Sequence, residues 1–140
     1  KILAALLDDA RKPFSEIANE LGVSGGTVHI RMEKLKKAGV VRGATLMLDY
    51  SALGYTIGAF VGINLHHARD YEKVLGKLKK VNGILEAHYT TGEFNIFCKI
   101  VTKSIPDLYD FLRELQGVAE IQTTQTTMIL SSPIVRELDL

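Results

Sequence analysis

The spacing of the apolar residues changes near residue 55, and this change limits the possible folds more than any other feature of the sequence. Up to Gly39 the apolar side chains recur every three or four positions, as in the run from Phe14 to Leu21, which is typical of amphipathic helices. From Tyr55 to Leu65 they alternate, which is typical of a strand with one buried face. Because the two patterns occupy separate parts of the chain, we expect a small helical domain followed by a larger domain built on a sheet.

The first part of the chain predicts three short helices. The pattern is already under way at Ile2, and we expect further residues upstream of it. The second helix begins near Pro13 and stops at Gly22, and the third is capped by Ser24 and stops at Gly39. Two helices joined by a short turn that contains glycine are the helix-turn-helix arrangement.

Residues 40–48 read as a short strand, a glycine and a second short strand, and we expect a β-hairpin wing beside the third helix. Residues 49–54 begin with polar side chains and close with Gly54, as a linker does. We therefore expect a domain at residues 1–48, a linker at 49–54 and a second domain at 55–140.

The second domain predicts the order strand, helix, strand, strand, helix, strand. The expected ranges are 55–65, 70–81, 84–91, 94–101, 104–117 and 120–130. Asp70 is the expected cap of the first helix, and Ser104 with Asp107 forms the capping box of the second. This βαββαβ order predicts an α+β, ferredoxin-like domain with one four-stranded antiparallel sheet and both helices on one face. On the first strand, Gly58 and Gly62 occupy the other face, and we expect two copies of the chain to pair their sheets there.

Composition and local sequence exclude several classes of protein. A chain of 140 residues with 46% apolar and 24% charged residues is globular rather than disordered. The single cysteine, Cys98, excludes an intramolecular disulfide and a multi-cysteine zinc site. The apolar run from Ile2 to Leu7 is too short for a signal peptide, and no apolar stretch reaches the ~18 residues that a membrane span needs. We expect a cytoplasmic protein with no membrane partner.

The sequence offers no convincing catalytic or metal-binding constellation. His66, His67 and His88 do not form a pair at helical i, i+4 spacing, so solvated or strand-end histidines are the favoured interpretation. No glycine-rich phosphate loop, Ser/His/Asp set or recognisable carboxylate pair is present. We expect no catalytic residue, no metal and no cofactor.

Positive charge gathers in and just after the third helix. Residues 31–42 hold five basic side chains and one acid, Glu33, on a chain whose net charge is +1. If Val28, Met32 and Leu35 face the core, the opposite side of this helix can contact phosphates and base edges of DNA. The candidate contacts are Ser24, Gly25 and Gly26 at the helix start, Thr27 and Ile30 to bases, Arg31 to a guanine or a phosphate, His29 to a base or to the helix flank, and Lys34, Lys36, Lys37 and Arg42 to phosphates. A solvated helix face is the alternative.

The last expected strand is polar on both faces from Gln122 to Thr127. An exposed edge strand would explain this, and a polar ligand pocket is the functional alternative. In that pocket one row of side chains would bind the ammonium, carboxylate and amide groups of a small amino acid, and the turn near residue 92 would form the facing wall. The candidate residues are Gln122, Thr124 and Thr126 in the strand, Thr91, Gly92 and Glu93 in the turn, with Glu93 facing the ammonium, and Tyr89, which either closes the site or packs in the core.

Several of these segments resemble one family of regulators. Residues 21–39, LGVSGGTVHIRMEKLKKAG, resemble the helix-turn-helix of the Lrp/AsnC, or feast/famine, transcription regulators, and Val41-Arg42-Gly43 and Leu53-Gly54-Tyr55 fit their wing and linker. The runs at 88–92 and 120–124 resemble the asparagine-responsive branch.

The resemblance implies a regulator of amino-acid metabolism that binds double-stranded DNA and carries a RAM/AsnC-type effector domain. It also implies an amino-acid effector, with asparagine favoured, bound in sites between dimers. The chain would assemble into dimers and often octameric rings. An enzyme is the alternative, because sirohaem-type decarboxylases share this two-domain build. Against it, the sequence has no His or Arg cluster suited to a tetrapyrrole.

Overall fold

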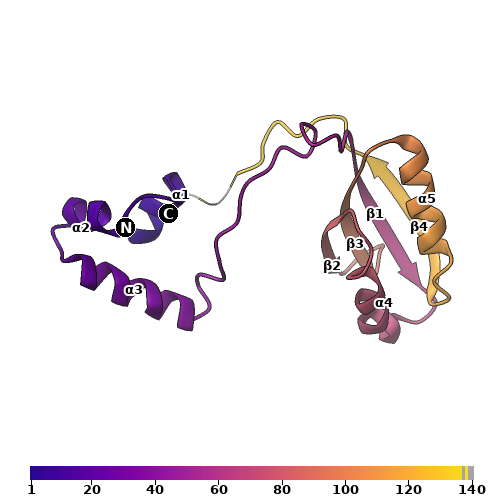
Figure 1. The fold of residues 1–140 in the computed structure, drawn as a ribbon. Coiled ribbons are helices and arrows are strands. Elements are labelled where there is room, and N and C mark those ends of the chain that lie inside the picture. The colour runs from indigo at the N-terminus through magenta and orange to yellow at the C-terminus, as the bar shows by residue number, and fades with distance from the viewer. Residues whose placement is uncertain (137, 139–140) are drawn as a thin grey trace. The chain divides into compact units, whose positions relative to one another are not determined.

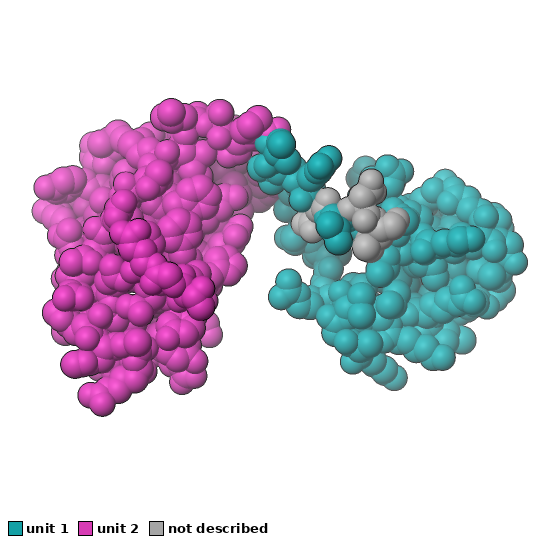
Figure 2. Space-filling model, turned by 180° about the vertical axis from the view of Figure 1, so that it is seen from behind, with its two compact units in different colours: residues 1–47, 134–140 teal, residues 48–133 magenta. Residues whose placement is uncertain are grey.

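The computed structural model describes residues 1–136 and 138. The chain divides into two compact units, shown in different colours in Figure 2. One unit is Lys1–Met47 together with the segment from Ile134 onward, and the other is Leu48–Pro133.

Three helices form the N-terminal unit, as the sequence predicts: α1 (Ile2–Asp8), α2 (Phe14–Leu21) and α3 (Gly25–Lys37) (Figure 1). Their apolar faces share one small core. Its buried members are Ile2, Ile17, Ala18, Val28 and Met32, with Leu35 packed at its margin. Gly22 ends α2 in the left-handed conformation at φ +64°, which a residue without Cβ adopts at little cost.

The hairpin wing expected over residues 40–48 is wrong, because residues 41–49 lie outside any helix or strand. A lone two-stranded hairpin is marginally stable unless one face packs against something. Here Leu46 and Met47 are 78% and 83% exposed, so their side chains do not pack against the described residues of this chain.

The C-terminal unit confirms the βαββαβ order. Its elements are β1 (Ile57–Leu65), a 3-10 turn (Ala68–Asp70), α4 (Tyr71–Leu78), β2 (Ile84–Tyr89), β3 (Ile96–Thr102), α5 (Ile105–Gln116) and β4 (Ile121–Met128). The strands form one antiparallel sheet in the order β2-β3-β1-β4, so β2 and β4 are its edges (Figure 1). No helix in the described part of the chain is long and apolar enough to cross a membrane.

One face of this sheet is covered by both helices. Ala59, Val61 and Ile63 of β1 are fully buried against Val74 of α4 and Leu115 of α5. The alternation read from the sequence therefore gives the correct buried face, because neighbouring residues of a strand point to opposite sides.

The opposite face of the sheet carries aromatic rings. Phe60 and Phe97 stack with centroids 5.6 Å apart, and Phe94 lies 5.9 Å from Phe97. The glycines of β1 do not leave an open surface here. A Cβ on Gly62 would lie 2.6 Å from ring atoms of Phe94, and Gly58 is covered by Ile129. This chain's own side chains therefore fill the space beside these glycines, and the pairing of two sheets on this face stays a prediction.

One of the two expected helix caps of this unit is present. The Ser104 hydroxyl accepts a hydrogen bond from the Asp107 N–H at 3.2 Å and donates to its carboxylate at 2.7 Å. Asp70 makes no such bond. It ends the 3-10 turn at φ −83°, ψ 4°, whereas a capping side chain needs the extended backbone that Ser104 adopts.

Candidate DNA interface and ligand-binding edges

The start of α3 is set by a short turn whose hydrogen bonds are satisfied locally. The Val23 N–H donates to the carbonyl of Ala18 at 2.9 Å, so Val23 joins the core margin and the chain turns directly into α3. The Ser24 hydroxyl accepts the Thr27 N–H at 3.2 Å and lies 2.9 Å from the Thr27 hydroxyl. This confirms Ser24 as the N-cap. The remaining N–H groups of the first turn can donate hydrogen bonds to a phosphate.

The face of α3 opposite the core is exposed and basic. Ile30 is 60% exposed, and Gly26, Arg31 and Lys34 are exposed on the same side, while Val28 and Met32 are buried. Thr27 is half-buried, and its hydroxyl lies 2.9 Å from that of Ser24. These positions repeat every three or four residues, which is the spacing of one helix face.

The basic side chains differ in how they are held. Lys36 pairs with Glu33 at 3.0 Å, and this hydrogen bond lowers the pKa of the Glu33 carboxyl. Within the part of the chain that the structure describes, Arg31, Lys34 and Lys37 form no ion pair, so their charges are available to phosphates.

Two further candidate DNA contacts lie away from this face. The ring of His29 packs edge-on against Phe14 at 5.9 Å, on the flank of α3. Arg42 is exposed in the segment that follows the helix.

The candidate effector residues lie at the two edges of the sheet. Thr124, Ile63, Ile96 and Tyr89 form one row across the four strands, all on the helix-covered face. The two isoleucines in the middle are fully buried. With strands ~4.8 Å apart, Thr124 and Tyr89 are separated by about 14 Å.

The Thr91–Glu93 turn is fixed to the end of β1. Thr90 donates its hydroxyl to the carbonyl of Phe94 at 2.8 Å, and the Asn95 side-chain oxygen accepts the Leu65 N–H at 2.9 Å. Gly92 takes φ +98°, where a side chain would be strained. Thr91, Gly92 and Glu93 are exposed and follow shortly after Tyr89, the exposed last residue of the edge strand β2.

On β4, the expected row of Gln122, Thr124 and Thr126 is interrupted. A bulge opposite Asn64 and Leu65 leaves Gln122 without a strand partner, so it does not continue the row of the two threonines. β4 lies at the edge of the sheet, which by itself explains its polar residues. A groove of about 380 Å³ lies between α4 and β2 and is lined among others by Leu75, Leu78 and Ile84. No predicted effector residue lines it.

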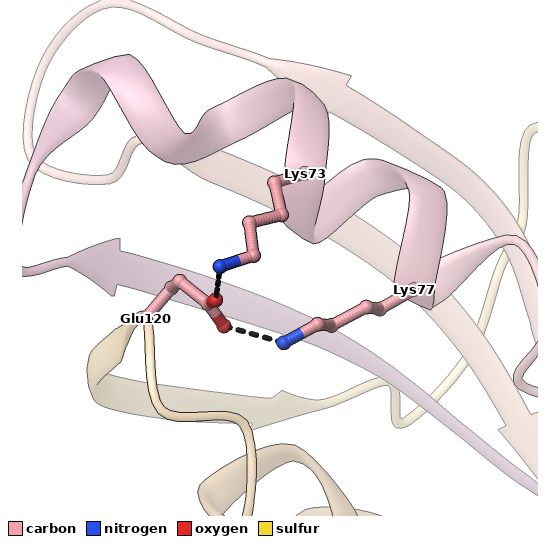
Figure 3. Close-up of polar contacts among 3 residues, drawn as sticks. All are labelled: Lys73, Lys77 and Glu120. Carbon is pink, nitrogen blue, oxygen red and sulfur yellow. Dashed lines mark hydrogen bonds and ion pairs between the residues drawn. The ribbon is translucent and has the colours of Figure 1, made fainter.

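The sequence analysis did not identify the ion-pair cluster at the start of β4. The Glu120 carboxylate lies between two lysines of α4, pairing with Lys73 and, at 2.6 Å, with Lys77 (Figure 3). These contacts lower the pKa of Glu120 to about 2. The i, i+4 spacing of the lysines was the available signal, since it places both on one helix face.

The remaining titratable groups do not suggest catalysis. Among residues 1–136 and 138, no group of three or more His, Cys, Asp or Glu side chains is placed to hold a metal ion. His66 and His67 are exposed, and His88 lies 3.3 Å from the Glu86 carboxylate. Burial raises the pKa of the Cys98 thiol to about 11, which keeps it protonated at neutral pH.

The third helix of the helix-turn-helix is capped, exposed and basic, and a separate βαββαβ domain follows it. This combination defines a DNA-binding transcription regulator with a second domain that can bind a ligand. Comparison with protein families agrees with this class. Residues 1–42 match the model described as winged helix-turn-helix DNA-binding, and residues 58–138 match the Lrp/AsnC ligand binding domain. The chain belongs to the Lrp/AsnC family.

Individual relatives are similar over almost the whole chain. Regulatory protein AsnC of Haemophilus influenzae is 42% identical over 99% of this chain and 93% of its own length. Regulatory protein AsnC of Escherichia coli is 43% identical over 96% of this chain and 90% of its own length. The solved structure of E. coli AsnC matches with a TM-score of 0.92 at 41% identity, covering 99% of this chain and 94% of that one. These relatives are named as regulatory proteins, and the decarboxylase alternative has no support among them.

Proposed function

We propose that this regulator controls genes of amino-acid metabolism in response to a small amino acid, with L-asparagine as the favoured effector. The family's ligand-binding domain and the similarity to regulators named AsnC support an amino-acid effector. Residues 1–48 act as the DNA-binding domain, 49–54 as the linker and 55–140 as the effector and assembly domain. The site of action is the cytoplasm, where the target DNA lies.

The DNA contacts are of two kinds, base contacts that give specificity and phosphate contacts that give affinity. Thr27, Ile30 and Arg31 face base edges in the major groove, where Ile30 meets a thymine methyl and Arg31 a guanine. The basic residues near the end of α3 hold phosphates and set affinity and register. They are Lys34, Lys36, Lys37 and Arg42, with the backbone of Ser24, Gly25 and Gly26 at the start of the helix. His29, packed on Phe14, supports the flank of α3.

The effector site takes residues from two copies of the chain. Asparagine carries an ammonium, a carboxylate and an amide within a few ångströms, whereas Tyr89 and Thr124 of one chain lie about 14 Å apart across two buried strands. One copy supplies the edge formed by Tyr89, Thr91, Gly92 and Glu93, with Glu93 facing the ammonium. The second copy supplies Gln122, Thr124 and Thr126. This separation is the observation that carries the proposal.

Assembly begins with a dimer formed through the aromatic sheet face. Phe60 and Phe97 form an apolar centre on the face opposite α4 and α5, and Glu86, His88 and Lys99 form a polar margin at the β2 edge. Such a centre and margin resemble the anatomy of protein interfaces. Dimers then meet edge to edge, and an octameric ring is the favoured closed form.

Titration calorimetry of the whole chain with each amino acid, combined with sedimentation velocity, tests this function. L-Asparagine binds and shifts the assembly state, since a ligand held between copies couples ligation to association. Leucine binds poorly, because its isobutyl chain leaves the Gln and Thr groups unpaired. The absence of binding by any amino acid at millimolar concentration contradicts the proposal, as does unchanged binding in both Gln122→Ala and Thr124→Val.

A further inference from the structure

The first residue of α4 stacks on the last residue of β2. The rings of Tyr71 and Tyr89 lie 4.2 Å apart between centroids, with their planes inclined by 24°. Tyr71 is half-buried against the core, and its hydroxyl donates to the Glu72 carboxylate at 3.0 Å. Tyr89 remains 52% exposed. The core therefore fixes the ring of Tyr71, and the ring of Tyr71 in turn supports the solvent-exposed ring of Tyr89.

α4 also forms ion pairs at the other edge of the sheet, next to β4 (Figure 3). Lys73 and Lys77 bind the carboxylate of Glu120, which directly precedes β4 and is only 10% exposed. With its pKa near 2, Glu120 is charged throughout the physiological range and keeps both contacts. α4 thus reaches both edges of the sheet, through Glu120 at β4 and through Tyr71 at β2, and this limits how far Tyr71 can move.

The support of Tyr89 bears on ligand binding because of where Tyr89 lies. It directly precedes the Thr90–Asn95 turn, in which Thr91 and Gly92 are exposed. A tyrosine face attracts an ammonium group and packs against a planar amide. An unsupported exposed ring samples several rotamers, and ordering it on binding weakens affinity.

We propose that Tyr71 is a positioning residue of the effector site, which fixes the ring of Tyr89 for the amino acid without touching the ligand itself. This inference rests on the proposed function, because it assigns the supporting contact of one edge of that site. It predicts that the aromatic ring of Tyr71 matters and that its hydroxyl does not.

The test compares L-asparagine affinity by titration calorimetry across matched variants of the whole chain. Tyr71→Leu removes the ring, Tyr71→Phe removes only the hydroxyl, and Tyr89→Leu removes the supported ring. Tyr109→Leu, a tyrosine 66% exposed on α5, is the control for loss of any surface tyrosine. Near-ultraviolet circular dichroism reports on the packing of the five tyrosines without a tryptophan signal, and loss of the stack is read from the change in Tyr71→Leu that is absent in Tyr109→Leu.

We expect Tyr71→Leu to weaken asparagine binding by about fivefold or more, and Tyr71→Phe and Tyr109→Leu to stay within about twofold of the unsubstituted chain. The double variant Tyr71→Leu/Tyr89→Leu binds no more weakly than Tyr89→Leu alone, because Tyr71 acts only through Tyr89. A merely structural role would instead weaken the double variant further. If Tyr71→Leu does not fold, as judged by its thermal transition, Tyr71→Met takes its place in the same comparison.

Different results refute the role of Tyr71 and the proposed function. If the unsubstituted chain binds asparagine and Tyr71→Leu binds equally well, the role of Tyr71 is refuted and the proposed function stands. Equal loss in Tyr71→Phe and Tyr71→Leu also refutes it, because the hydroxyl is then the group that matters. If the unsubstituted chain binds no amino acid, the proposed function is refuted and this inference falls with it.

Discussion

Gly62→Ala tests how tightly the aromatic sheet face is packed. A methyl group at Gly62 would lie 2.6 Å from three ring atoms of Phe94, about 1 Å closer than carbon atoms normally approach. Phe94 cannot move freely, because its ring also packs 5.9 Å from that of Phe97. Overpacking of this kind costs about 1–3 kcal/mol, and replacing a strand glycine returns about 0.5–1 kcal/mol. We therefore expect a net loss of about 1–2 kcal/mol in the free energy of unfolding.

Urea denaturation followed by far-ultraviolet circular dichroism, at one fixed chain concentration, measures this loss. Gly58→Ala is the matched control on the same strand and face, since its Cβ meets only the side chain of Ile129 at 3.4 Å, and it is expected to be at least as stable as the unsubstituted chain. Gly62→Ala/Phe94→Leu recovers part of the loss by making room for the methyl group. The reasoning is refuted if Gly62→Ala is as stable as the unsubstituted chain, or if the second substitution recovers nothing.

Three further predictions concern charge, capping and DNA reading. Glu120 has a pKa near 2 in the folded chain against an ordinary value of 4.5, so its contribution to the free energy of unfolding is complete above pH 4.5 and is lost as the pH falls toward 2. In denaturation measurements at a series of pH values, the stability advantage over Glu120→Gln therefore disappears across that range. The control Asp110→Asn, which breaks an exposed pair with Arg113, changes the stability little. Ser24→Ala removes the α3 cap and lowers the free energy of unfolding by about 1 kcal/mol, and an unchanged urea midpoint contradicts this. Arg31→Ala reduces discrimination between specific and non-specific DNA in anisotropy titrations, while Lys36→Ala weakens both about equally; equal weakening by both variants removes the distinction between base and phosphate contacts.

The periodicity of apolar residues predicted most of the secondary structure, because each helix or strand buries one face and that face has a regular spacing in the sequence. The alternation in β1 and the i, i+4 rows of α2 and α3 correspond to real buried faces, and Ser24 and Ser104 cap helices as expected. The hairpin predicted for residues 40–48 does not form, because strand propensity alone does not supply a surface for the strands to pack on.

The candidate effector site shows where sequence patterns stop being informative. The turn at Thr91–Glu93 and the polar strand at Gln122–Thr127 were both identified, but their separation depends on strand order and register, which no local pattern encodes. The bulge at Gln122 and the occupation of the Gly62 surface by Phe94 have the same origin, since both are contacts between distant segments. The Tyr71–Tyr89 stack joins elements that the sequence could place only separately.

The salt dependence of DNA binding tests the central claim, that α3 and the residues after it hold the DNA. Anisotropy titrations of duplex DNA from the regulator's own promoter, at several salt concentrations, compare the unsubstituted chain with Lys34→Gln/Lys37→Gln/Arg42→Gln. If these side chains contact phosphates, the slope of log K against log salt becomes shallower by about 0.9 for each lost contact in every bound chain. An unchanged slope, or salt-insensitive binding by the unsubstituted chain, would contradict the account.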